Sequence, residues 1–262
     1  MPIVANHAHE KLKGGQLIIG IMVRLNCTVE IARVAEACDH DFVLLDMQHG
    51  GMGIETAIKV CHAALSTSVT PLVRVSSKQA TDASRLLDNG AMGIVAPDID
   101  SAEEARHLVS VCRFPPLGKR SVAIGYPQLG YAAMPIVDAS RALDENTMLV
   151  AMIETEKGVE NAEEIAAVEG IDLLFVGSGD LLAGMGISDQ MGTKRHYDLC
   201  EKVAKACKKH GKFFGVGGAR EPKQQATLVE MGFRFVTTDS DMAFLLASAR
   251  ERAKMLRGLD LG

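Results

Sequence analysis

Charged and imidazole side chains lie within or just after a series of short apolar runs. Glu154 follows Met-Leu-Val-Ala-Met-Ile, and Asp180 follows the next β-rich run after Gly-Ser-Gly. Asp46 and His49 come after an earlier run, and Arg74 lies inside Pro-Leu-Val-Arg-Val. A buried carboxylate is costly unless it is paired or binds a cation, so these positions could supply metal ligands, a base and an anion-binding guanidinium.

Glu154 and Asp180 are candidate ligands of a hard divalent ion. They are separated by one strand–helix unit, which would put them on neighbouring strands, and no Cys or His lies near them in the sequence. Two carboxylates without nitrogen or sulfur ligands suit Mg or Mn. The alternative is that each carboxylate accepts backbone amides or pairs with an arginine.

His49 and Arg74 are candidates for proton transfer and anion binding. His49 lies in a strand-to-glycine turn, whereas the other seven histidines occupy helices, loops or the N-terminal segment. Histidine can act as a base near neutral pH, although one at a strand end can also be structural or simply exposed. Arg74 needs an anion, either a protein carboxylate or a substrate carboxylate or enolate.

The elements that must position these side chains alternate regularly. Short β-rich runs are followed by stretches with apolar residues at helical spacing. The expected strands cover residues 17–23, 42–46, 71–75, 93–97, 148–154, 172–177, 213–217 and 233–238. Eight such units predict a single (β/α)8 TIM barrel over residues 1–262 with a short N-terminal helix, because an open doubly wound sheet rarely holds eight even units. The site is then expected where the C-terminal ends of the strands meet.

The alternation breaks between Arg113 and Asn146, where prolines and glycines are frequent. A connection of this length is usually a functional loop or lid. We therefore expect a long Pro/Gly-rich loop after the fourth barrel helix, with a role in substrate selection. Elsewhere the pattern predicts ordinary helices, including one from about Gln79 to Asp88 and one opened by a capping box at Ser101.

Composition and charge exclude several classes of protein. The net charge is 28 − 33 = −5, no basic stripe is present, and the chain has no Trp and three Tyr, so nucleic acid and anionic membranes are disfavoured as partners. The six cysteines lie far apart without a CxxC pair, which is not typical of a zinc site or a disulfide scaffold. The first residues lack a signal-peptide pattern and no apolar run could cross a bilayer, so we expect a cytoplasmic location.

Two further chemistries are disfavoured. A Schiff-base aldolase needs a lysine near a strand end, and no expected strand carries one. Gly217 and Gly218 could bind a phosphate, but Asp239 and Asp241 follow the eighth strand and would repel it. Carboxylate substrates are therefore favoured over phosphorylated ones.

With these residues in place, the chain resembles the metal-dependent (class II) pyruvate aldolases of the HpcH/HpaI family. The resemblance runs over nearly the whole chain and is carried by residues 42–50, 71–75, 86–97, 113–121, 153–155 and 175–181. It implies that Glu154 and Asp180 bind a divalent ion (Mg, Mn or Co). It also implies that His49 transfers protons, with Asp88 as its orienting partner.

The same resemblance implies how a substrate would bind. Arg74 would hold the keto or enolate oxygen of pyruvate, and backbone amides near Ser178 and Gly179 would receive its carboxylate. The implied reaction is the reversible cleavage of a 4-hydroxy-2-oxo acid to pyruvate and an aldehyde through a metal-stabilised enolate, with oxaloacetate decarboxylation as a side activity. The implied assembly is a homohexamer in which the last helix, with its apolar face from Met242 to Leu256, packs onto a neighbouring subunit.

The chain departs from the family pattern at three positions. The family commonly has Glu at position 48, Gln at 152 and Pro at 178, where this chain has Gln48, Met152 and Ser178. Met152 removes a possible polar contact to the ion or the substrate. Two other functions remain open: a CoA-ester or isocitrate-lyase-like lyase, which would need a basic pocket for a nucleotide, and a non-catalytic barrel that binds an oxo acid. The aldehyde partner is not determined by the sequence.

Overall fold

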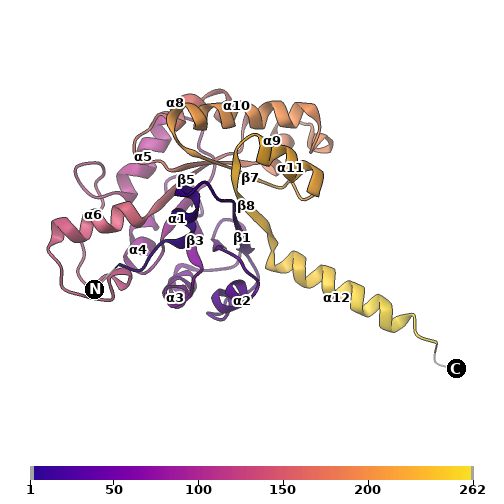
Figure 1. Ribbon diagram of the computed structural model, residues 1–262, viewed down its shortest axis with the longest axis horizontal. Coiled ribbons are helices and arrows are strands. Elements are labelled where there is room, and N and C mark those ends of the chain that lie inside the picture. Colours follow the sequence, from indigo (N-terminus) through magenta and orange to yellow (C-terminus); the bar gives the residue numbers. More distant parts are fainter. Residues whose placement is uncertain (1–2, 261–262) are drawn as a thin grey trace.

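The computed structural model describes residues 3–260, and its centre is a closed barrel of parallel strands (Figure 1). In order, the strands are β1 (Ile18–Val23), β2 (Phe42–Asp46), β3 (Thr70–Arg74), β4 (Gly93–Ala96), β5 (Met148–Ile153), β6 (Leu173–Gly177), β7 (Phe213–Gly217) and β8 (Phe233–Ser240). Each strand pairs with the next, and β8 pairs back onto β1. The expected (β/α)8 barrel is therefore confirmed.

The strands form because their apolar runs are buried on both faces, as parallel sheets require. Every residue of β2 and of β5 is buried. One set of side chains fills the barrel, where the rings of Phe42 and Phe235 stack with centroids 4.5 Å apart. A Cβ at Gly20 would overlap the Phe42 ring, so the glycine makes room for this inner packing.

All of the helices except α12 lie around the barrel, and α1 closes the end formed by the N-termini of the strands. They are α1 (His7–Lys13), α2 (Ile31–Ala37), α3 (Ile54–Ala64), α4 (Ala83–Asp88), α5 (Ala102–Cys112), α6 (Ile136–Asn146), α7 (Glu156–Glu160), α8 (Ala162–Ala166), α9 (Ser178–Gly184), α10 (Lys194–His210), α11 (Pro222–Glu230) and α12 (Asp241–Arg257). α1 places Ala8 and Leu12 against the inner barrel residues and so covers the N-terminal ends of the strands. No helix within residues 3–260 is long and apolar enough to cross a membrane.

Two expectations about the connections need correction. The expected loop from Arg113 to Asn146 is only partly a loop, because its last 11 residues form α6. Two of its aromatic rings, those of Phe114 and Tyr126, pack with side chains of α6 in a small core of their own. The helix expected from Gln79 begins only at Ala83, because Ala80 adopts a left-handed φ of 49° that a helix cannot contain. By contrast, Ser101 does cap α5 by accepting a hydrogen bond from the backbone of Glu104.

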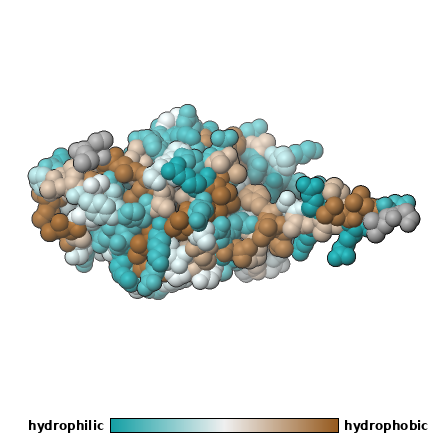
Figure 2. Space-filling model, turned by 90° about the horizontal axis from the view of Figure 1, so that it is seen from below, coloured by the Kyte–Doolittle hydropathy of each residue, from teal (hydrophilic) through white to brown (hydrophobic). Residues whose placement is uncertain are grey.

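Helix α12 departs from the usual barrel arrangement. It projects away from the barrel instead of covering β8 and β1, and none of its residues is buried (Figure 1). Figure 2 shows apolar surface along this projection. The large exposed apolar residues of the helix are Met242, Phe244, Leu245, Leu246, Met255 and Leu256. The carboxylate of Asp241, its first residue, accepts hydrogen bonds from the backbone of residues 24–26 and so fixes the root of the helix.

Candidate active site

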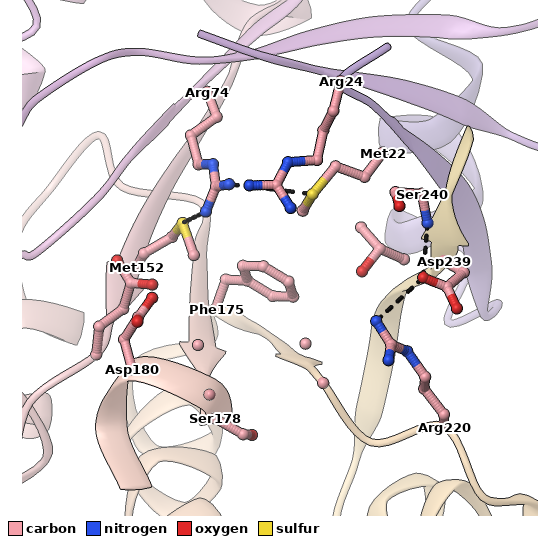
Figure 3. Close-up of a pocket in the computed structure, with 16 residues that line it drawn as sticks. Met22, Arg24, Arg74, Met152, Phe175, Ser178, Asp180, Arg220, Asp239 and Ser240 are labelled. Atoms are coloured by element: carbon pink, nitrogen blue, oxygen red, sulfur yellow. Dashed lines mark hydrogen bonds and ion pairs between the residues drawn. The ribbon is translucent and has the colours of Figure 1, made fainter. Parts of the chain in front are cut away.

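A polar cavity of about 160 Å³ opens at the C-terminal ends of the strands (Figure 3). Its walls come from strands on both sides of the barrel, so residues far apart in the sequence meet there. The charged lining residues are Arg24, Arg74, Glu154, Asp180, Arg220 and Asp239. A second hollow adjoins it, because Glu154 and Asp180 line both.

Glu154 and Asp180 lie together between β5 and β6, which are neighbours in the barrel. Glu154 directly follows β5 and is 3% exposed, and Asp180 lies in the first turn of α9. The Glu154 carboxylate accepts a hydrogen bond of 3.2 Å from the backbone N–H of Asp98. Burial raises the pKa of Glu154 to about 7, and the nearby charges of Asp98 and Asp180 also raise it. Glu154 is thus a buried carboxyl group beside an exposed one, that of Asp180.

These two residues fit a divalent cation. No cation among residues 3–260 forms an ion pair with Glu154, so its charge is left for another partner. A Cβ at Gly177 would overlap the Glu154 carboxylate, so the glycine keeps the space beside it open. Within residues 3–260 no group of three or more His, Cys, Asp or Glu side chains could hold an ion. A metal bound here would therefore take its other ligands from water or substrate oxygens, as Mg²⁺ usually does.

Arg74 is held by Asp46, its register partner on the neighbouring strand. Arg74 Nε and Nη2 donate to the two carboxylate oxygens at 2.9 and 2.7 Å, and Arg24 Nε lies 3.0 Å from Oδ2. Burial of Asp46 opposes ionisation, but the hydrogen bond and charge of Arg74 outweigh it and lower the pKa of this carboxyl. The alternative that Arg74 pairs with a protein carboxylate is therefore correct for the edge of the guanidinium formed by Nε and Nη2.

The other edge of Arg74 lines the cavity. Its Nη1 and Nη2 lie 4.0 Å from the sulfur atoms of Met152 and Met22, respectively (Figure 3). A thioether is a weak acceptor, so these N–H groups can still bind a stronger one. Met152 thus occupies the place beside Arg74 at which the family commonly has a glutamine.

His49 lies in the turn after β2 and lines the second hollow together with Glu154 and Asp180. Its backbone N–H donates to Asp46 at 3.2 Å, so the carboxylate that orients Arg74 also fixes this turn. The structure therefore brings four of the predicted residues, His49, Arg74, Glu154 and Asp180, to two adjoining hollows at one end of the barrel.

Asp88 does not lie with them. It is the last residue of α4, at the opposite, N-terminal end of the barrel, and its carboxylate accepts a hydrogen bond of 2.7 Å from Arg120. Among the described residues of one chain, Asp88 does not contact His49, because the length of the strands separates the N-terminal end of the barrel from the C-terminal end. The pairing stays a prediction that only a contact between subunits could satisfy.

Ser178 and Gly179 line the cavity as the first residues of α9, a helix that follows β6 without a loop. His196 on α10 fixes the serine: its Nδ1 accepts the backbone N–H of Gly192 at 3.2 Å, and its Nε2 lies 2.9 Å from Ser178 Oγ. Burial lowers the pKa of His196 and so favours the neutral ring. Because Nδ1 accepts the N–H of Gly192, the proton of the neutral ring lies on Nε2, which donates to Ser178 Oγ. Helix α9 was not expected from the sequence, although Asp-Leu-Leu after the glycines is typical of a helix start.

Arg24 and Arg220 are two further residues of the cavity that were not expected from the sequence. Arg24 directly follows β1, and Arg220 lies in the loop after β7, where it pairs with Asp239 at 3.1 Å. Both line the cavity. The same rule that found the other residues, a polar side chain after a strand end, could have found these two.

Comparisons with known proteins agree with the fold. The model of the HpcH/HpaI aldolase/citrate lyase family matches residues 25–247. The chain is 32% identical to a 4-hydroxy-4-methyl-2-oxoglutarate aldolase of Hapsidospora irregularis over 96% of this chain and 94% of that protein. It is 34% identical to a hydroxypyruvate/pyruvate aldolase of Rhizorhabdus wittichii, over 81% and 84% of the two chains. A crystal structure of an HpcH/HpaI aldolase from Desulfitobacterium hafniense superimposes with a TM-score of 0.90 at 28% identity, covering 97% of each chain.

Proposed function

Because the chain belongs to the HpcH/HpaI aldolase/citrate lyase family, we propose that it is a divalent-metal-dependent pyruvate aldolase. Its curated relatives are named as aldolases, and the chain is a carbon–carbon lyase. The proposed reaction is the reversible cleavage of a 4-hydroxy-2-oxo acid into pyruvate and an aldehyde. The observation that carries the proposal is the grouping of His49, Arg74, Glu154 and Asp180 around adjoining hollows.

The pyruvate half of the substrate would lie between the acidic pair and Arg74. A divalent ion (Mg, Mn or Co) held by Glu154 and Asp180 would stabilise negative charge on the keto oxygen. Arg74 would donate to the same oxygen from the edge that faces the cavity, and Asp46 keeps that guanidinium oriented. The backbone amides of Ser178 and Gly179 would receive the carboxylate.

His49 would transfer the proton. In cleavage it takes the proton of the 4-hydroxyl group, the C3–C4 bond breaks, and C4 becomes the aldehyde carbonyl. The electron pair of that bond forms the enolate of pyruvate, whose C3 then takes up a proton. Loss of carbon dioxide from oxaloacetate would give the same enolate, so we expect this decarboxylation as a side activity.

We further propose that the whole chain is one catalytic domain that assembles through α12, as a homohexamer. The support is a helix of 17 residues with no buried residue and with large apolar side chains exposed along it. A cytoplasmic location is proposed because all six cysteines are free thiols, which is usual in a reducing compartment.

The test is retro-aldol cleavage measured over a panel of 4-hydroxy-2-oxo acids, with and without a chelator. Chelation should abolish cleavage, and added Mg, Mn or Co should restore it. Metal-dependent exchange of the C3 protons of pyruvate is the second readout, because a barrel that only binds an oxo acid would not accelerate it. Full activity in excess chelator would contradict the proposal.

A further inference from the structure

The start of α9 has little in its own sequence to hold it in place. Gly177, Ser178 and Gly179 lead directly to Asp180, one of the two proposed metal ligands (Figure 3). Glycine has more conformational freedom than any other residue, and no described side chain caps this helix. Gly179 and Asp180 are also exposed, so burial does not fix them. The side chain of Ser178 is therefore the only one between β6 and Asp180 that can hold this segment.

His196 provides that hold. Its ring and Ser178 are both fully buried, and Nε2 donates to Ser178 Oγ at 2.9 Å. The ring is itself fixed, because Nδ1 accepts the backbone N–H of Gly192 at 3.2 Å. Cys200 Sγ lies 3.5 Å from the same Nε2, but sulfur is a weak acceptor, so the serine oxygen is the main partner. One imidazole thus joins the start of α9 to the first turn of α10.

Helix α10 is a firm support for this contact. It has 17 residues, whereas α9 has seven. It packs along β6, β7 and α8, and it buries Leu199, Cys200 and Val203 in the core between the barrel and its helices. A short, glycine-flanked segment at the cavity is therefore tied to a long helix that packs on two strands.

The residue type at position 178 makes such a hold necessary. The family commonly has proline there, and Ser178 is the first residue of α9. Proline is favoured at the first position of a helix, because its ring fixes φ near the helical value. Serine fixes no backbone angle, so this chain needs another constraint at the same point. The hydrogen bond from His196 is such a constraint.

We propose that His196 is a positioning residue of the active site, which acts through Ser178. By holding the start of α9, it keeps Asp180 directed towards Glu154, with which it lines both hollows. It thereby raises the fraction of molecules whose cavity is arranged to bind a divalent ion and pyruvate. This consequence for ligands rests on the proposed aldolase function, whereas the hold on the backbone of α9 does not depend on it.

Two substitutions of His196 separate the roles of its ring nitrogens. Asparagine has its amide at about the place of Nδ1, so His196→Asn keeps a partner for Gly192 and loses the donor to Ser178. Glutamine extends its amide to about the place of Nε2, so His196→Gln keeps a donor to Ser178. His210→Asn, the same substitution at the other end of α10, is the matched control.

The first measurement is amide hydrogen exchange, read by mass spectrometry in a peptide that covers α9. His196→Asn should speed exchange there by about tenfold, the change in population that corresponds to the loss of one buried hydrogen bond. His196→Gln and His210→Asn should stay within about twofold of the wild-type protein.

The second measurement is the dissociation constant of Mg²⁺ by calorimetry, together with KM and kcat for the exchange of the C3 protons of pyruvate. With the segment in its binding position in about a tenth of the molecules, His196→Asn should raise the dissociation constant and KM by about tenfold and change kcat less. In a Ser178→Pro background, His196→Asn should change neither constant further. Proline removes the hydroxyl group and fixes the same backbone angle.

Unchanged hydrogen exchange in α9 of His196→Asn would overturn the positioning role. A lower free energy of unfolding with unchanged Mg²⁺ binding and KM would also overturn it, because His196 would then only stabilise the fold. Equal effects of His196→Asn in the serine and proline backgrounds would show that it does not act through Ser178. A wild-type protein that does not accelerate pyruvate proton exchange would overturn the proposed aldolase function instead, and hydrogen exchange in α9 would still decide whether His196 holds this helix.

Discussion

At the scale of single residues, one buried carboxylate organises much of the site. Asp46 is fully buried, binds Arg74 through two hydrogen bonds and accepts the backbone N–H groups of Gln48 and His49. It therefore fixes the guanidinium proposed to bind the substrate and the turn that carries the proposed base. A buried charge that is paired and hydrogen-bonded in this way restricts the positions of its neighbours.

Replacing Arg74 with lysine tests this arrangement. A lysine cannot hold both oxygens of Asp46 and still present a second N–H edge to the cavity. We expect Arg74→Lys to lower kcat/KM of cleavage by more than about tenfold, as for the loss of a bidentate contact. Arg195→Lys is the matched control, and an unchanged rate for Arg74→Lys would mean that this arginine is only structural.

Glu154 gives a prediction about pH and stability. Burial raises its pKa from 4.5 to about 7. Between these two pH values, the Glu154 carboxyl is therefore protonated in the metal-free native protein but ionised in the unfolded chain. Stability should therefore fall as the pH rises from about 5 to 8, by on the order of 2–3 kcal/mol relative to Glu154→Gln, whose side chain does not titrate.

The measurement is denaturant unfolding of both proteins in chelator at several pH values. Saturating Mg²⁺ should stabilise the wild-type protein at pH 8 and should leave Glu154→Gln nearly unaffected, because the variant lacks one of the two carboxylates proposed to bind the metal. Identical pH profiles for the two proteins would contradict the raised pKa.

At the scale of elements, the strand order decides which residues meet. β5 and β6 are adjacent, which brings Glu154 beside Asp180, and β2 and β3 are in register at Asp46 and Arg74. The helices contribute mainly their first residues, which hold the loops and backbone of the site in place, and they contribute few reactive side chains. α9 begins directly at the cavity, and the start of α12 holds the loop that carries Arg24.

Asp241 links this loop to α12 and can be tested alone. Its carboxylate accepts backbone N–H groups from Arg24, Leu25 and Asn26, so Asp241→Ala should leave these donors without their partner. We expect a loss of about 1–3 kcal/mol in the free energy of unfolding at fixed protein concentration. Asp138→Asn, which changes an exposed ion pair with Arg141, should change it by less than about 0.5 kcal/mol, and equal effects would refute the role of Asp241.

At the scale of the whole molecule, an unpartnered helix points to an assembly. α12 exposes apolar side chains that a stable monomer would cover, and large apolar patches usually mark interfaces. Leu245→Asp combined with Leu256→Asp should therefore dissociate the assembly, so that light scattering gives a lower molecular mass than for the wild-type protein. Arg250→Gln with Lys254→Gln, on the same helix, should leave the mass unchanged, and a monomeric wild-type protein would contradict the proposed hexamer.

The sequence by itself determined the barrel, the end at which the site lies, and the grouping of His49, Arg74, Glu154 and Asp180. These follow from local patterns, because apolar periodicity defines each strand and the parallel order brings the strand ends together. The tertiary structure decided the pairing of Arg74 with Asp46, the separation of Asp88 from His49, and the recruitment of Arg24 and Arg220 to the cavity. It also decided that α12 projects away from the barrel of its own chain. Such contacts depend on register and on the closure of the barrel, which join residues through space and leave no periodic signal along the chain.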